Sequence, residues 1–144
     1  MGKKRIATKQ GTPGEGSSRA RSSSRLPKRK VASGLLTIQA TFNNTKACIT
    51  DKEGNVLFWS SSGSLGFKGA KKGTPFAASK VGEVLGEKAK NLGVKDVDVL
   101  VKGVGSGREP VIRAVMAFDI DINSIKDRTP VPHNGVKQKK PRRV

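Results

Sequence analysis

The chain is poor in the residues on which enzymes and metalloproteins most often depend. Its 144 residues include one cysteine, one histidine and no tyrosine. A single thiol, Cys48, excludes an internal disulfide framework and is typical of a reducing compartment, so we expect a cytoplasmic protein. The spacing of several Cys and His residues that would hold zinc is absent, and we expect no metal and no cofactor.

Long apolar runs are also absent. No segment approaches the roughly 20 apolar residues that cross a bilayer, and no signal-peptide core follows Met1. We therefore expect no membrane among the partners of this chain. A length of 144 residues suits one domain with an adequate core.

Acidic residues are few, and this shortage gives the chain its strongest signal. There are 11 Asp and Glu residues against 29 Lys and Arg residues, so the formal net charge is +18. Residues 1–30 carry a net charge of +9, residues 31–125 carry +3, and residues 126–144 carry +6. Such a field favours a polyanion as partner and disfavours an enzyme acting on small neutral substrates.

The uneven charge predicts three segments. Residues 1–32 form a basic N-terminal arm that has too few apolar side chains to fold alone, and we expect it to be disordered. Residues 33–126 form a nearly neutral globular domain that binds the polyanion, and residues 127–144 an extended basic tail. The arm either keeps the protein soluble or binds the polyanion, and its composition favours binding.

Hydrophobic periodicity in the globular segment predicts an α/β fold with a mixed five-stranded sheet and two main helices. The five predicted strands cover residues 35–41, 45–50, 56–60, 97–101 and 120–125. Between the first two strands, Asn43 and Asn44 predict a tight hairpin turn, since asparagine tolerates a positive φ. Thr74 and Pro75 begin the first helix, which Gly93 ends. The second helix covers residues 108–118.

Two glycine-rich segments precede the predicted helices and are candidate phosphate-binding loops. In the segment Gly103–Arg108, glycines allow close approach of a phosphate to a helix N-terminus, and Arg108 adds a matching guanidinium fork. This segment lacks the final glycine of a dinucleotide site, and a plain connecting turn remains the alternative. Residues 63–74 fail the spacing of a nucleotide-binding loop, but Lys68, Lys71 and Lys72 predict a flexible basic loop suited to a phosphate backbone. An ordinary connection is the alternative.

Catalytic constellations are weak. His133 lies in the basic tail, and Cys48 lies in the middle of a strand without a histidine, so we interpret it as a buried structural thiol. The pairs Asp96/Asp98 and Asp119/Asp121 would each lie on one face of a strand, whereas a two-metal nuclease needs carboxylates from several elements. A nuclease with a ribonuclease H-like fold is the main rival hypothesis. A general nucleic-acid chaperone is a weaker one.

Aromatic residues make up only 4% of the chain. Trp59 and the phenylalanines could stack on bases, but so few aromatic rings argue against a single-strand stacking platform. Phe76 and Phe118 fit the predicted core better. We therefore expect recognition through phosphate contacts, loop shape and tails.

Five long motifs stand in a distinctive order along the chain. They are IQATFNNT at residues 38–45, WSSSGSLGFKG at 59–69, TPFAA at 74–78, VKGVGSGRE at 101–109 and TPVPHNG at 129–135. In these motifs the chain resembles the family of bacterial small-subunit ribosomal protein eleven, collinearly from about Ser33 to Val144. Val104 departs from the family, which usually has proline there.

The resemblance implies a structural protein with a ribonuclease H-like topology but no nuclease activity. It implies a position on the platform of the small ribosomal subunit, near the messenger exit and the Shine–Dalgarno duplex, with a role in subunit assembly and translation. Small-subunit rRNA and the neighbouring proteins seven and eighteen would be its partners. With the basic tails added, the expected rRNA-binding residues are Lys28, Arg29, Lys30, Asn43, Asn44, Lys68, Lys71, Lys72, Gly105, Ser106, Gly107, Arg108, Arg113, Arg128, His133, Asn134, Lys139, Lys140, Arg142 and Arg143.

The dipeptide Asn134-Gly135 suggests chemistry without an enzyme. Glycine leaves its backbone nitrogen unhindered, so that nitrogen can attack the Asn134 side-chain carbonyl, and a flexible tail permits the required conformation. The succinimide that forms would open to aspartate or isoaspartate. The alternative, which we favour, is that the dipeptide only makes a turn.

Overall fold

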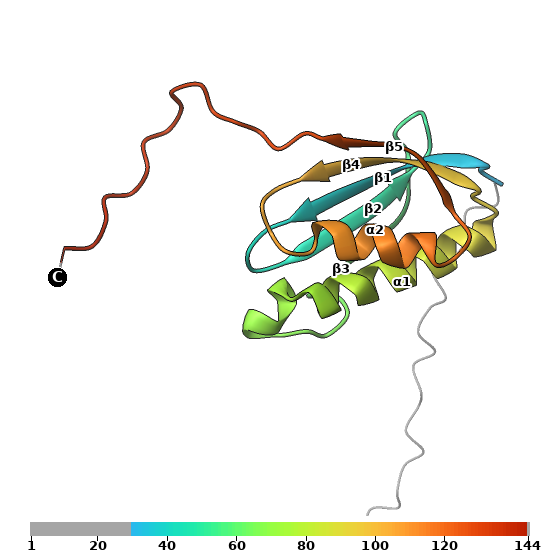
Figure 1. Ribbon diagram of the computed structural model, residues 1–144, viewed down its shortest axis with the longest axis horizontal. Coiled ribbons are helices and arrows are strands. Elements are labelled where there is room, and N and C mark those ends of the chain that lie inside the picture. Colours follow the sequence, from blue (N-terminus) through green and yellow to red (C-terminus); the bar gives the residue numbers. More distant parts are fainter. Residues whose placement is uncertain (1–29, 144) are drawn as a thin grey trace, which may run out of the picture.

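The computed structural model describes residues 30–143 and shows the mixed α/β fold predicted from the sequence. The sheet has the strand order β3-β2-β1-β4-β5, and both long helices cover the same face of it (Figure 1). The elements along the chain are β1 (Ser33–Ala40), β2 (Thr45–Thr50), β3 (Val56–Ser61), the 3₁₀ helix η1 (Gly69–Gly73), α1 (Pro75–Leu92), β4 (Asp96–Lys102), α2 (Arg108–Met116) and β5 (Asp121–Asp127).

The sheet combines an antiparallel meander with two parallel strands. β1 pairs with β2, and β2 with β3, in antiparallel fashion, whereas β4 lies parallel to β1 and β5 parallel to β4. The alternation predicted in the first strand is confirmed, because Leu36, Ile38 and Ala40 are buried beneath the helices. The opposite side chains of the sheet lie on a face that no helix covers.

The predicted signals of the first helix are confirmed at both ends. The Thr74 hydroxyl accepts a hydrogen bond from the Ala77 N–H at 3.3 Å, Pro75 is the first helical residue, and Gly93 ends the helix with a φ of 89°. Within α1, small residues allow α2 to approach closely. A Cβ on Gly82 would lie 2.7 Å from the Ala114 Cβ, which is too close for any side chain there.

Several local predictions were wrong. The hairpin at Asn43 and Asn44 exists, but neither residue has a positive φ. Thr41 closes the turn instead: its N–H donates to the Asn44 carbonyl at 2.9 Å, and its hydroxyl accepts from the Asn44 N–H at 3.1 Å. Asp119 lies in the turn before β5, with a φ of 61°, and so shares no strand face with Asp121.

The side chains of Phe76 and Cys48 also differ from expectation. Phe76 is 64% exposed in the first turn of α1, where it meets Phe67 edge to face, so its predicted place in the core was wrong. Phe118, in contrast, packs against the core as expected, although it is only half-buried. Cys48 is half-buried on the uncovered face of the sheet, and burial raises the pKa of its thiol. The basic segment predicted as a loop contains η1.

Candidate nucleic-acid interface

Three connections and the start of the C-terminal tail meet at one end of the molecule, which we call the loop end (Figure 1). β1, β4 and β5 run parallel, so their carboxyl ends share one edge of the sheet. There the β1–β2 hairpin, the segment from β3 to α1 and the β4–α2 connection lie side by side. The tail leaves β5 at the same end and extends away from the globule.

Two serine hydroxyls join these connections. Ser62 is fully buried, and its Oγ lies 2.6 Å from the Asn44 Oδ1 and 2.8 Å from the Lys72 carbonyl oxygen. Ser106 donates from its hydroxyl to the Gly73 carbonyl at 2.8 Å. The hairpin, the basic segment and the glycine-rich connection are therefore held as one surface rather than as three independent loops.

The glycines between β4 and α2 serve close packing. A Cβ on Gly103 would lie 2.1 Å from the Ala40 carbonyl oxygen, and one on Gly105 would lie 2.2 Å from the Thr41 carbonyl oxygen. The Gly105 N–H donates to the Ala40 carbonyl at 3.0 Å, so this amide is used inside the fold. Close packing against the hairpin therefore accounts for Gly103 and Gly105, while Ser106 stays exposed.

Arg108 has partners within the chain. Its guanidinium donates to the Gly103 carbonyl and to the Asp127 carboxylate, and its side chain is 33% exposed. The Asp127 carboxylate also accepts from the Thr129 N–H at 2.8 Å and from the Thr129 hydroxyl at 2.6 Å. The Arg108 guanidinium, followed by Thr129, holds the pKa of Asp127 well below its usual range.

The same network reaches back to the glycine-rich connection. The Thr129 hydroxyl oxygen accepts a hydrogen bond from the Gly103 N–H at 3.1 Å, and the Arg128 N–H donates to the Val101 carbonyl at 2.8 Å. The first residues of the tail are thus fixed to the end of β4. Arg108 in this arrangement anchors the tail, and any phosphate would compete with Asp127 for its guanidinium.

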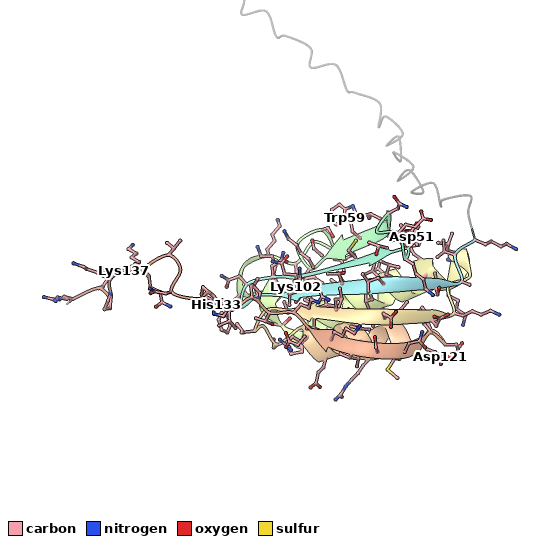
Figure 2. The ribbon with its side chains drawn as sticks, turned by 90° about the horizontal axis from the view of Figure 1, so that it is seen from above. Asp51, Trp59, Lys102, Asp121, His133 and Lys137 are labelled. Carbon is pink, nitrogen blue, oxygen red and sulfur yellow. The ribbon has the colours of Figure 1, made fainter. Side chains whose placement is uncertain are left out.

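Lysines lie at both ends of the globule, but acidic side chains gather at the end opposite the loops. Lys68 and Lys71 are exposed and Lys72 half-buried at the loop end, and within the described residues none of them forms an ion pair with a carboxylate. Asp51 and Asp121 lie at the opposite end, far from the tail that carries His133 (Figure 2). This separation favours a polyanion at the loop end.

The structure brings together only part of the predicted set. Arg113 is exposed on α2, paired with Glu109 at 3.1 Å, and Lys30 lies beside Asp51, at the end opposite the loops. The other predicted residues beyond β5 follow one another along the tail and are exposed, namely Arg128, His133, Asn134, Lys139, Lys140, Arg142 and Arg143, although Arg128 is tethered by its backbone. Lys28 and Arg29 lie outside the described residues.

Sequence reasoning missed two lysines. Lys46 is the second residue of β2 and Lys102 the last of β4, and both are exposed on the uncovered face of the sheet next to the loop end (Figure 2 labels Lys102). The alternation of apolar and polar residues along both strands indicates that these two side chains point away from the core. Their closeness depends on the register of three strands, which the sequence alone does not give.

Among residues 30–143 there is no group of three or more His, Cys, Asp or Glu side chains that could hold a metal ion. Asp96 and Asp98 instead accept hydrogen bonds from Asn123 and Ser124 on the neighbouring strand, at 2.8 Å and 2.6 Å. In the same part of the chain, no helix combines the length and apolar character needed to cross a bilayer.

A comparison with protein families gives a match over the globule and nearly all of the tail. The family model of ribosomal protein S11 matches residues 34–143, which include both helices and, apart from the first residue of β1, the whole sheet. Proteins of this family are structural components of the small ribosomal subunit that bind rRNA. The match spans far more than half of the 144 residues, and the chain therefore belongs to the ribosomal protein S11 family.

Proposed function

We propose that this chain is a bacterial, cytoplasmic protein whose loop end and basic tails bind rRNA on the platform of the small ribosomal subunit. The observation that carries the proposal is the meeting of three hydrogen-bonded connections, exposed lysines and the anchored tail at one end. The resemblance of the five motifs supports a position near the messenger exit and the Shine–Dalgarno duplex, beside small-subunit proteins seven and eighteen.

In this proposal the globule sets position and the tails supply charge. The loop end is rigid because Ser62 and Ser106 link its parts, so it presents its lysines in a fixed arrangement that suits a folded RNA. The tail neutralises phosphates between RNA helices that would otherwise repel one another. Neutralisation of this kind supports assembly of the subunit without any catalytic step.

The proposal is tested by a pair of matched variants. Lys68→Gln/Lys71→Gln removes two positive charges at the loop end, and Lys52→Gln/Lys95→Gln removes two exposed ones at the opposite end. Binding to small-subunit rRNA is measured over a range of salt concentrations. The loop-end variant should weaken binding and reduce the log–log salt slope by roughly 0.7–0.9 for each phosphate that the protein no longer neutralises. Equal effects of the two variants would contradict the proposed surface.

A further inference from the structure

The face of the sheet that the helices leave uncovered has ordered rows of side chains, because the strand register aligns them. The row nearest the loop end contains Lys46, Gln39 and Lys102 on β2, β1 and β4. The next row runs from Trp59 through Cys48 and Thr37 to Leu100 and Lys126. Figure 2 looks onto this face and shows Trp59 and Lys102 on it.

Trp59 is a large aromatic side chain that this face leaves exposed to solvent. It is 64% exposed on β3, an edge strand, and it belongs neither to the core nor to the partly buried side chains around it. It borders a shallow hollow of about 230 Å³ whose lining includes Gln39, Lys46 and Cys48. An indole ring beside a hollow whose lining is mainly apolar can receive one flat ring, and a single tryptophan limits the site to one base rather than a platform.

The charges of this face also point to a specific class of ligand. Lys46, Lys102 and Lys126 are exposed, and none of them forms an ion pair within residues 30–143. The acidic residues Asp96 and Asp98 lie toward the opposite end of the same face. An anionic chain is therefore attracted to the half that contains Trp59 and disfavoured over the other half.

We propose that Trp59, Gln39, Lys46 and Lys102 form a second RNA-binding surface, the open-face patch, which takes a single-stranded segment. One base stacks on Trp59, and phosphates lie at Lys46 and Lys102. Lys46 and Lys102 lie on the two strands that neighbour the strand of Gln39. The backbones of these two strands are roughly 10 Å apart, which leaves room for a nucleotide between the lysines. The Gln39 amide supplies both a donor and an acceptor for a base edge or a 2′-hydroxyl. This inference rests on the proposed function, because it assumes that RNA is the polyanion.

The chain offers a direct probe of the patch. Trp59 is its only tryptophan and there is no tyrosine, so selectively excited intrinsic fluorescence reports on this one ring. The full chain is titrated with a labelled twelve-nucleotide oligouridylate, while the anisotropy of the label and the tryptophan emission are followed together. Stacking of a base should quench the emission at least about twofold, in parallel with binding.

Three variants separate stacking from other causes. Trp59→Phe keeps a flat aromatic ring and should bind nearly as the parent does, whereas Trp59→Leu stays apolar but should weaken binding by about fivefold or more. Lys46→Gln/Lys102→Gln should weaken both binding and quenching. The control Lys52→Gln/Lys95→Gln removes the same charge far from the patch and should leave the quenching unchanged.

The outcomes are distinct. If anisotropy shows bound RNA while the emission stays constant and Trp59→Leu binds like the parent, the open-face patch is overturned and the loop end remains the binding surface. If neither the oligonucleotide nor small-subunit rRNA binds, the proposed function itself fails. If isolated small-subunit protein seven or eighteen changes the emission and RNA does not, the face binds protein, and the inference is overturned as well.

Discussion

The guanidinium of Arg108 holds the carboxylate of Asp127, and this contact ties the first residue of α2 to the last residue of β5. Because Asp127 also accepts two hydrogen bonds from Thr129, the contact fixes the first turn of the tail. The globule thereby determines the direction in which the basic tail leaves the loop end. A phosphate contact by Arg108 would require this arrangement to open.

The roles of Arg108 can be separated by mutation. If its fork binds phosphate, Arg108→Ala should cost about 1.5–3 kcal/mol of RNA affinity, and Arg108→Lys should recover only part of it. The Asp127→Asn variant then distinguishes a guanidinium that anchors the tail from one that binds phosphate. Removal of the anchor should speed exchange of the Thr129 amide proton and weaken RNA binding, as Arg108→Ala does. Stronger RNA binding by Asp127→Asn would instead show that Asp127 competes with phosphate.

The anchor should also depend on pH. The pKa of Asp127 is lowered in the folded chain, mainly by Arg108 and then by Thr129, so the contact stabilises the fold above the ordinary aspartate pKa. Its contribution disappears as the pH falls through the lowered pKa, which places the change below about pH 4. The Thr129 amide shift followed by NMR should titrate in this acid range, and Arg108→Ala should move its midpoint upward. An unchanged midpoint would contradict the ion pair.

Substitution of Gly103 tests the close packing between the β4–α2 connection and the end of β1. In Gly103→Ala the new Cβ would meet the Ala40 carbonyl, and the φ of 97° is unfavourable for alanine, so urea unfolding should show a decrease in stability of about 1–3 kcal/mol or more. Gly54→Ala is the matched control, because Gly54 has a φ of 94° but no atom within 4 Å of the new Cβ. Equal decreases in both variants would assign the whole effect to φ.

The tails should contribute affinity without contributing to the fold. Deleting residues 1–30 or 131–144 removes much of the positive charge, and the second deletion keeps Thr129 and its anchor. Each truncated chain should bind small-subunit rRNA more weakly and with a smaller salt slope, while its urea unfolding midpoint stays that of the full chain. Unchanged affinity at several salt concentrations would show that the tails do not bind RNA.

The dipeptide Asn134-Gly135 either makes only a turn or also undergoes deamidation. Its φ of 53° places it in the left-handed region, which is what a turn at Asn134-Gly135 requires. If the dipeptide also deamidates, peptide mass spectrometry of aged protein should show the small mass gain of an amide converted to an acid, with fragments diagnostic of isoaspartate. Intact asparagine in both free and ribosome-bound protein would leave the turn as the whole explanation.

Local signals in the sequence predicted the elements well, and contacts between distant segments account for what was missed. Thr74, Pro75 and Gly93 act within one turn of helix, so their roles could be inferred directly. Phe76 follows the apolar spacing of α1 but is exposed at the loop end, and periodicity cannot show where a helix extends beyond the sheet. The partner of Arg108 lies nineteen residues further along the chain and reaches it only because β5 pairs with β4.

Directed cleavage of rRNA shows which end of the globule faces the RNA. A hydroxyl-radical source is tethered to a single cysteine in a Cys48→Ser background, either at Ala70→Cys in η1 or at Glu53→Cys in the opposite turn, and the protein is assembled into small subunits. Both positions are exposed. If the loop end faces rRNA, we expect strong cleavage of small-subunit rRNA from position 70 and weak cleavage from position 53. Equal cleavage from both, or stronger cleavage from position 53, would contradict it.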